Sequence, residues 1–186
     1  QGEGVWTGHA AWFIRLGGCD VGCSFCDVKE SWPSEAHPRV DVATLVQEAV
    51  ASGLPRVVVT GGEPTMHDLG PLTEALKAEG LATHLETSGT GMVSGQWDWV
   101  TLSPKKFKVC KEAWYSRANE LKVVVVNSHD LKWAEEHAAK LQTGTAMFLQ
   151  PEWDRREEVM ERVLNRIQEA PQWRLSLQTH KFIGLP

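Results

Sequence analysis

Three cysteines within eight residues carry the clearest chemical signal in this sequence. Cys19, Cys23 and Cys26 follow the spacing C-x3-C-x2-C, and the aromatic Phe25 directly precedes the last of them. Thiolates this close on one loop can bind three corners of a cubane iron–sulfur cluster and leave the fourth iron open. The remaining cysteine, Cys110, lies far along the chain in a lysine-rich stretch, and we expect it to be a bystander thiol.

Zinc binding and a disulfide are the alternatives for these cysteines. Zinc prefers four tetrahedral ligands, usually as two separated pairs, so an all-cysteine site would require Cys110. A site of three cysteines and one of the seven histidines stays open. A disulfide with a spare thiol suits a secreted protein, and nothing else in the sequence indicates secretion. The spacing therefore favours an open cluster.

The cysteine loop closely resembles that of the radical S-adenosylmethionine (SAM) enzymes. In that family the open iron chelates the amino and carboxylate groups of SAM, and one electron from the cluster cleaves SAM to a 5′-deoxyadenosyl radical. The resemblance implies a [4Fe-4S] cluster held by Cys19, Cys23 and Cys26.

The elements that must position this loop follow a repeated strand-then-helix pattern. We expect strands at 9–16, 56–60, 81–86, 99–102, 121–126 and 146–150, with an added strand at 173–178. We expect helices at 41–52, with Asp41 as N-cap, and near 69–79, 131–141 and 156–169. Apolar, β-branched strands alternating with amphipathic helices predict a parallel sheet covered by helices. Two connections lack a helix. The fold class is therefore α/β, an incomplete, open (β/α)6-type radical SAM partial barrel with fewer helices than strands.

Composition narrows the classes of function. The chain has 186 residues, which fits one domain over 1–186, and its formal net charge is −5, which argues against a surface that coats nucleic acid. No apolar run reaches membrane-spanning length and no signal segment opens the chain. Because the cysteine loop suits a reducing compartment, we expect a soluble, cytoplasmic protein. The sequence starts at Gln1 without a methionine, so we expect a few residues to precede it.

Polar and glycine-rich segments follow the predicted strands, at the edge where parallel sheets bind ligands. After the second strand come Thr60 and the run GGEP at 61–64, whose two glycines allow close approach of the backbone to a ligand. This run resembles the GGE motif of radical SAM enzymes, which contacts the amino group of SAM. The candidates for SAM binding are Gly62, Glu63, Ser88, Ser103, Pro104, Lys105, Gln150, Pro151, Glu152 and Trp153.

Two further features concern the substrate. Arg15 lies inside the apolar run 11–16, where a charge is costly unless a carboxylate or bound anion neutralises it. Its planar guanidinium suits a bidentate carboxylate. The segments QGEG at 1–4 and QTHK at 178–181 carry amide and acid–base groups without an obvious structural duty, although a lone His180 is more often a surface histidine.

Together these segments resemble the 7-carboxy-7-deazaguanine synthase family along essentially the whole chain. The runs QGEG, RLGGC, CSFCD, TGGEP, ETSGT, SPK, ELKVV, LQP and WRLSLQTHK occur in that order. The resemblance implies a carbon–nitrogen lyase of queuosine-type biosynthesis. It would convert 6-carboxy-5,6,7,8-tetrahydropterin to 7-carboxy-7-deazaguanine with loss of ammonia, after the adenosyl radical takes the hydrogen at C6.

The same resemblance implies which residues bind the substrate and which partner proteins the enzyme needs. It implies that substrate is bound by Gln1, Gly2, Glu3, Arg15, Thr60, His180 and the terminal Pro186. None of these is a certain catalytic residue, and Arg15, Glu3 and His180 are expected to assist. A flavodoxin- or ferredoxin-type electron donor is also expected, and the many tryptophans make a homodimer plausible.

Position 28 departs from the family pattern. A Thr or Ser commonly follows the Cys-Asp pair and joins a Mg²⁺ that steers the substrate, but here Val28 follows Asp27. Mg²⁺ prefers octahedral oxygen ligands and readily keeps waters. We therefore expect Mg²⁺ either to be held by substrate, water and Asp27 or to be dispensable. A lesser departure is Ser88, where Asn is frequent.

Two rival functions stay open at this point. A radical SAM activase that makes a glycyl radical on a partner protein shares the cysteine spacing and the small size. It would not need the QGEG and QTHK ends or Arg15. A non-catalytic iron–sulfur or zinc-binding protein predicts no cleavage of SAM.

Overall fold

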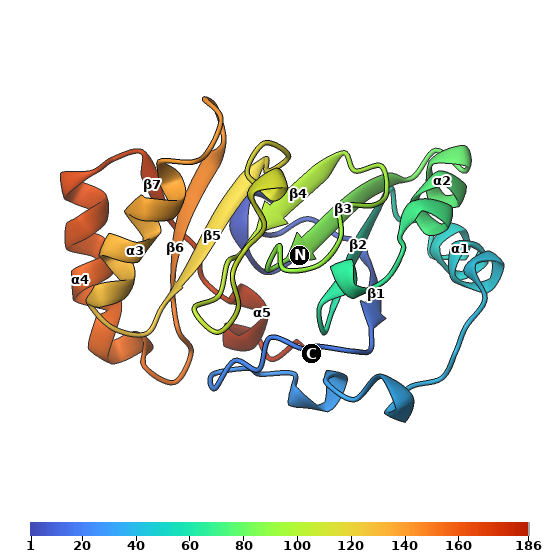
Figure 1. The fold of residues 1–186 in the computed structure, drawn as a ribbon, viewed down its shortest axis with the longest axis horizontal. Coiled ribbons are helices and arrows are strands. Elements are labelled where there is room, and N and C mark those ends of the chain that lie inside the picture. Colours follow the sequence, from blue (N-terminus) through green and yellow to red (C-terminus); the bar gives the residue numbers. More distant parts are fainter. Residues whose placement is uncertain (186) are drawn as a thin grey trace. The chain divides into compact units, whose positions relative to one another are not determined.

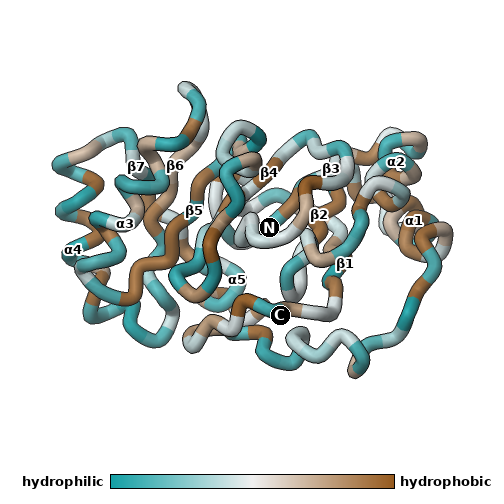
Figure 2. Tube along the Cα trace, viewed as in Figure 1, coloured by the Kyte–Doolittle hydropathy of each residue, from teal (hydrophilic) through white to brown (hydrophobic). Residues whose placement is uncertain are grey.

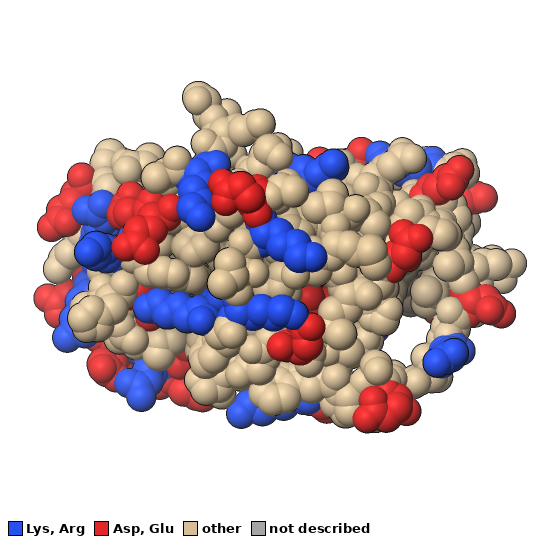
Figure 3. Space-filling model, viewed as in Figure 1, with Lys and Arg blue, Asp and Glu red and all other residues tan. Residues whose placement is uncertain are grey.

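The computed structural model describes residues 1–185, which form two compact units (Figure 1). The cysteine-loop unit is Ala10–Trp114, and the terminal unit combines residues 1–9 with residues 115–185. On the face drawn in Figure 3, basic and acidic side chains are interspersed. In the described part of the chain, none of the helices combines the length and the apolar character needed to cross a membrane.

The cysteine-loop unit contains four parallel strands that pair in chain order. They are β1 (Trp12–Leu16), β2 (Arg56–Gly61), β3 (Ala82–Thr87) and β4 (Trp99–Leu102). Side chains alternate between the two faces, so one row across the strands is apolar. That row contains Ile14, Val59, Leu85 and Val100, each at most 4% exposed. The next row places Arg15 beside Thr60 and Glu86 beside Thr101.

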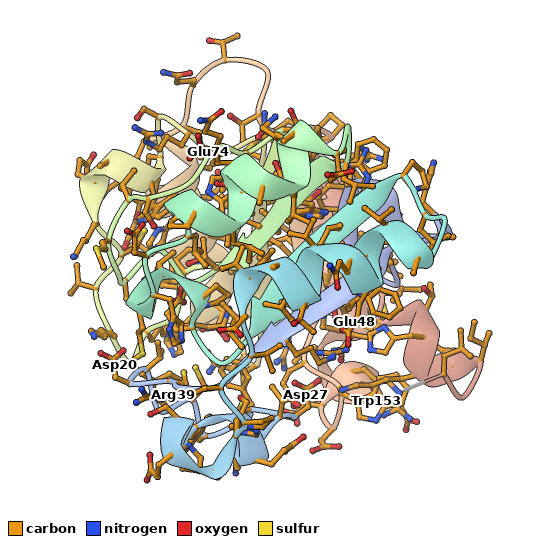
Figure 4. The ribbon with its side chains drawn as sticks, turned by 90° about the vertical axis from the view of Figure 1, so that its right-hand side faces the viewer. Asp20, Asp27, Arg39, Glu48, Glu74 and Trp153 are labelled. Atoms are coloured by element: carbon orange, nitrogen blue, oxygen red, sulfur yellow. The ribbon has the colours of Figure 1, made fainter. Side chains whose placement is uncertain are left out.

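Two helices lie on the same side of these strands (Figures 1 and 4). They are α1 (Val42–Ala51), which begins after Asp41 at the predicted N-cap position, and α2 (Gly70–Ala78). Leu72 and Leu76 of α2 are buried, at 4% and 0% exposure, and their four-residue spacing gives the helix its apolar stripe. Because the helices cover the apolar face of the strands, the polar groups of this unit come mainly from the loops that follow the strands.

The terminal unit contains three parallel strands, β5 (Glu120–Val125), β6 (Ala146–Pro151) and β7 (Trp173–Leu175). Helix α3 (His129–Ala138) packs against β5, and α4 (Arg156–Glu169) packs against β6 and β7. The apolar residues of these strands form a continuous core, visible as the brown segments of β5 and β6 in Figure 2. Its largest member is Trp173, at 1% exposure.

Both chain ends belong to the terminal unit. The first residues form a short 3-10 turn, η1 (Gly4–Trp6), and the last described residues include α5 (Thr179–Phe182). The backbone N–H of Thr179 donates to the carbonyl of Gly2 at 2.9 Å, so the two ends are joined directly.

The predicted order of strands and helices is confirmed, with corrections at the start of β1 and at the end of β7 and with one additional helix. β1 begins at Trp12 rather than at residue 9, because His9 closes a turn onto the carbonyl of Trp6. β7 ends at Leu175, where the hydroxyl of Ser176 instead bonds the side chain of Gln150. Helix α5 was not expected. Residues 1–185 contain five α-helices and seven strands, which confirms the expected shortage of helices. The single domain over 1–186 stays a prediction.

Candidate active site

The cysteine loop begins where β1 ends, and backbone hydrogen bonds fix its start. The N–H of Gly18 donates to the carbonyl of Ser31 at 2.7 Å, and that of Cys19 donates to the carbonyl of Trp32 at 3.1 Å. The indole of Trp32 also donates to the sulfur of Cys26 at 3.4 Å. The loop is therefore folded back on residues 31–32, which brings the first and last cysteines to one anchored segment.

None of the four cysteines, all of which lie within residues 1–185, takes part in a disulfide bond. Burial raises the pKa of Cys23, the thiols of Cys26 and Cys19 raise it further, and the ammonium of Lys105 partly offsets this. A cluster binds thiolates, so loading must release the proton of Cys23. Across residues 1–185, no three His, Cys, Asp or Glu side chains converge as ligands of a single metal ion. A cubane differs because its cysteines bind separate irons, and three thiols on one loop fit that arrangement.

The GGEP turn after β2 lies directly against the cysteine loop. The N–H of Glu63 donates to the carbonyl of Gly18 at 2.8 Å. A Cβ added at Gly62 would overlap that same carbonyl and would lie 3.2 Å from the Cβ of Cys19. Only glycine allows this approach, so the turn predicted to bind SAM is held against the first cluster ligand.

The Glu63 side chain is a buried hydrogen-bond acceptor. Its carboxylate is 2% exposed and accepts hydrogen bonds from the N–H of Thr65 at 3.0 Å, the hydroxyl of Thr65 at 2.6 Å and the hydroxyl of Thr87 at 2.5 Å. It also accepts from the N–H of Ser88 at 2.8 Å and from the Ser88 hydroxyl. Glu63 therefore ties the turn after β2 to the loop after β3. As a contact to SAM through its side chain it stays only a prediction.

The other predicted SAM residues of this unit adjoin the same network. The N–H of Ser103 donates to the carbonyl of Thr87 at 2.7 Å. The ammonium of Lys105 donates to the carbonyl and hydroxyl of Ser103, both at 2.6 Å. Ser88, Ser103 and Pro104 are buried. The loops after β2, β3 and β4 are thus joined at the carboxyl ends of their strands.

Arg15 differs from its prediction as a buried charge. It is exposed, and its guanidinium lies 5.5 Å from the ring centroid of Phe13. Alternation along β1 places Ile14 in the apolar row and leaves Arg15 in the polar one, so no internal carboxylate is required. Its register partner is Thr60, which places two predicted substrate residues side by side.

The sequence interpretation missed a polar pair in β3. The side chain of His84 is 1% exposed; its Nε2 lies 2.9 Å from the hydroxyl of Thr101 and 3.5 Å from Oε1 of Glu86. His84 and Glu86 alternate with the buried Thr83 and Leu85, and that period-2 pattern in the run ATHLET was the available signal.

In the terminal unit, the predicted substrate residue Glu3 contacts Gln178 of the QTHK segment. Glu3 forms an ion pair with Lys122 at 2.5 Å and accepts from the Gln178 amide at 3.0 Å. Burial alone would raise the pKa of Glu3, but the attraction and hydrogen bond of Lys122, with the Gln178 bond, lower it overall. Glu3 is therefore an oriented carboxylate. Lys122 was not predicted, although a lysine inside the strand ELKVVV was a visible signal.

Gly2 and His180 are also neighbours. The carbonyl of Gly2 accepts from both the N–H and the hydroxyl of Thr179, at 2.9 and 2.8 Å, and a Cβ at Gly2 would overlap the His180 ring. The side-chain oxygen of Gln1 accepts from the N–H groups of Gly2 and Glu3, at 2.7 and 3.3 Å. The structure thus brings residues 2–3 and 178–180 together. Pro186 lies outside the described residues.

In the segment at the end of β6, predicted SAM-binding side chains make hydrogen bonds within the protein. Gln150 is 4% exposed and accepts from the hydroxyl of Ser176 at 2.8 Å. The carboxylate of Glu152 accepts from the N–H groups of Asp154 and Arg155, at 3.2 and 3.1 Å, which shapes the turn before α4. Pro151 is buried.

Trp153 lies among basic and aromatic groups. Its ring is 4.3 Å from the Arg156 guanidinium, 5.2 Å from the Lys181 ammonium and 5.0 Å from the Phe182 ring. These contacts link the segment after β6 to α5. The roles of these residues in SAM binding stay predictions.

Comparisons with known proteins agree with this geometry. The model of the radical SAM superfamily matches residues 13–166, so the chain belongs to that superfamily. The chain is also 54% identical, over 185 residues, to a 7-carboxy-7-deazaguanine synthase of Synechocystis, covering 100% of this chain and 88% of that protein. It is 34% identical to the Escherichia coli K12 enzyme of the same name, covering 100% of this chain and 94% of that protein. The chain therefore belongs to the 7-carboxy-7-deazaguanine synthase family.

A solved structure gives the same result. The crystal structure of QueE from Escherichia coli matches with a TM-score of 0.83 and 35% identity, covering 97% of this chain and 90% of that one. The predicted α/β radical SAM partial-barrel class is confirmed by this match and by the superfamily model. The family assignment disfavours the glycyl-radical activase and the non-catalytic protein.

Proposed function

We propose that this chain converts 6-carboxy-5,6,7,8-tetrahydropterin to 7-carboxy-7-deazaguanine with loss of ammonia, as a carbon–nitrogen lyase. The observation that carries the proposal is the packing of the first residues against the last. Gly2 contacts Thr179 and His180, and Glu3 contacts Gln178. A glycyl-radical activase would not need these segments, and relatives named 7-carboxy-7-deazaguanine synthase match the whole chain.

The residues present fit a [4Fe-4S] cluster and SAM. Three free thiols on one anchored loop supply the ligands, and Gly62 allows the GGEP turn to pack directly against the start of that loop. When bound, the cluster would supply the electron needed for reductive cleavage of SAM, and Cys19, Cys23 and Cys26 would hold it. The Glu63 network joins the turn after β2 to the loop after β3, both of which carry predicted SAM-binding residues.

The chain's own groups orient the pterin and hold its charges. Glu3 stays ionised because Lys122 lowers its pKa, so it accepts hydrogen bonds from the N–H edge of the pterin ring. Arg15 is exposed and offers a planar guanidinium to the substrate carboxylate, with the hydroxyl of Thr60 beside it. Gly2, Gln1, His180 and Pro186 remain assigned to substrate binding as part of the proposal.

Further parts of the proposal concern metal, donor and assembly. Asp27 is exposed and Val28 offers no side-chain oxygen, so any Mg²⁺ would be held mainly by substrate and water. Activity that survives rigorous chelation would exclude an essential Mg²⁺. A flavodoxin- or ferredoxin-type protein supplies the electron. The free thiols of the cysteine loop suit the reducing cytoplasm. The chain forms a homodimer, and light scattering would test this oligomeric state.

One experiment tests the function. The protein is reconstituted anaerobically and given SAM, dithionite and the carboxylated tetrahydropterin, and mass spectrometry follows 5′-deoxyadenosine, ammonia and the deazapurine. We expect the deazapurine and ammonia to form together. Cleavage of SAM without the deazapurine would support an activase instead, and no cleavage would support a non-catalytic protein.

A further inference from the structure

The loop after β4 carries a concentrated positive charge. Residues 105–111, here called the lysine loop, contain four lysines and no acidic residue, although the whole chain has a formal charge of −5. Two acidic residues are near the lysine loop: Asp20, which pairs with Lys108, and Glu112, which follows the loop in sequence. Because the loop has four lysines, its local charge stays positive. A local charge opposite to that of the whole protein steers partners of one sign to one place.

Two apolar side chains on the lysine loop face solvent. Val109 is 86% exposed and Phe107 is 48% exposed. Lys106 and Lys111, on either side, are exposed as well. Exposed apolar side chains rimmed by charges are typical of surfaces that bind another protein.

The lysine loop is held in place at both ends. Lys105 and Lys108 pair as an antiparallel bridge, and the N–H of Lys111 donates to the carbonyl of Gly89 at 2.9 Å. Cys110 and Trp114 are buried, at 7% and 0% exposure. The exposed side chains are thus displayed on an anchored turn, which lowers the entropy lost when a partner binds.

The lysine loop also contacts the cysteine loop. The ring of Phe107 lies 5.8 Å from that of Phe25, which directly precedes Cys26, and Lys108 forms an ion pair with Asp20, one residue after Cys19. Asp20 is labelled at its place on the cysteine loop in Figure 4. A protein bound to the lysine loop would therefore lie against the covalent neighbours of two cluster ligands.

We propose that the lysine loop is the docking surface for an acidic one-electron carrier protein. The inference rests on the proposed function, because the oxidised cluster must be reduced before it can cleave SAM. The carrier protein loses one electron and the oxidised cluster gains it. The rate of electron transfer falls steeply with the distance between donor and acceptor. Lysines attract the acidic partner and Val109 and Phe107 supply the apolar centre of the contact. Lysines also attract nucleic acid, but the phosphate backbone of a nucleic acid would gain little from contact with these two apolar side chains.

The test compares two charge reversals of equal size. One double variant, Lys106→Glu with Lys111→Glu, alters the lysine loop. The control, Lys132→Glu with Arg162→Glu, makes the same change at exposed positions of α3 and α4. A third variant, Val109→Ser, removes the most exposed apolar side chain without changing charge.

Three readouts separate docking from catalysis: affinity for oxidised flavodoxin by thermophoresis, turnover driven by reduced flavodoxin, and turnover driven by dithionite. We expect the loop double variant to weaken binding and raise the KM for flavodoxin at least tenfold. Val109→Ser should do so about threefold, a modest loss for one exposed apolar side chain. Dithionite-driven turnover should stay within twofold, and binding to the unaltered protein should weaken with added salt.

Equal affinities for the loop and control variants would overturn the proposal, as would preferential binding of an RNA oligonucleotide over flavodoxin at the lysine loop. Failure of the proposed function gives a different result. In that case the unaltered protein forms no deazapurine with either reductant, while flavodoxin affinity still reports on the lysine loop.

Discussion

At the scale of single residues, chemistry and position were predictable to different degrees. The three cysteines and the two end segments could be found from spacing and order alone. The exposure of Arg15 could not, because an apolar run does not reveal which face of a strand is covered. The role of Glu63 could not either, because its five hydrogen bonds come from residues 65, 87 and 88, which only the fold brings together.

Substituting Arg15→Lys tests its role as the group that binds the substrate carboxylate. Lysine keeps the charge but loses the planar pair of donors. We expect the KM for the carboxylated pterin to rise about tenfold, equivalent to about 1.4 kcal/mol. Steady-state kinetics with dithionite provides the measurement, and Arg39→Lys, at an exposed position labelled in Figure 4, is the control. An unchanged KM would remove Arg15 from the binding site.

Substituting Glu63→Ala tests the buried carboxylate. The donors of Thr65, Thr87 and Ser88 would lose their acceptor, so we expect the free energy of unfolding to fall by about 3 kcal/mol. Urea denaturation under reducing conditions measures the change. The exposed Glu74→Ala on α2, labelled in Figure 4, should change stability by less than about 0.5 kcal/mol. Equal effects from both variants would contradict a special role for Glu63.

At the scale of elements, strands such as β2 and β5 were predictable because their β-branched runs are continuous. The predicted strand ends were wrong where a side chain makes another hydrogen bond in place of strand pairing, as at Ser176. They were also wrong where a segment packs elsewhere, as at His9. Helix α5 spans only Thr179–Phe182, too short for a periodic apolar pattern. Contacts between elements, such as the GGEP turn against the cysteine loop, depend on the fold.

The contact between that turn and the cysteine loop is tested by Gly62→Ala. The added methyl would overlap the carbonyl of Gly18 and displace the start of the loop. We expect less than half of the iron and sulfide of the unaltered protein to be retained after reconstitution. Gly70→Ala is the control, because its Cβ would meet only the flexible side chain of Asp68 at 3.2 Å. Full cluster content in Gly62→Ala would show that the loop tolerates the shift.

Helix α3 carries a pH-sensitive contact to the chain before β5. Nδ1 of His137 lies 2.6 Å from the hydroxyl of Tyr115. Burial, with the nearby Lys140, lowers the pKa of His137 to about 4. The unfolded chain then binds the proton more readily, so stability is complete above about pH 6.5 and falls as the pH drops towards 4. Unfolding free energies at pH 7 and 4.5 should differ less in His137→Gln than in the unaltered protein. The same slope in both would assign the pH dependence to other groups.

At the scale of the whole molecule, fold class and family were predictable, because ordered motifs span the chain. The division into two units was not, because it depends on residues 1–9 leaving the neighbouring sequence to pack with residues 115–185. No local pattern in QGEG indicates the distant partners Lys122 and Gln178.

Deleting residues 1–9 tests this division. Lys122 would lose its ion pair with Glu3 while remaining in β5, so the terminal unit should be destabilised. We expect hydrogen–deuterium exchange to accelerate at least tenfold in β5 and β7 and to change less than twofold in β2 and β3. Thr7→Ala, at an exposed position of the same segment, should leave both regions unchanged. Uniform acceleration across the chain would show that the two units open together.

The cysteine-loop unit is continuous in sequence, whereas the terminal unit needs residues 178–180 to complete the packing of Gly2. A ribosome therefore finishes the two units at different times, since chains fold from the N-terminal side as they emerge. The thiols that receive the cluster are folded while much of β5 to α5 is still unmade. Residues 2 and 3 therefore find these partners only after residues 178–180 have been made, so the packing around Glu3 forms late.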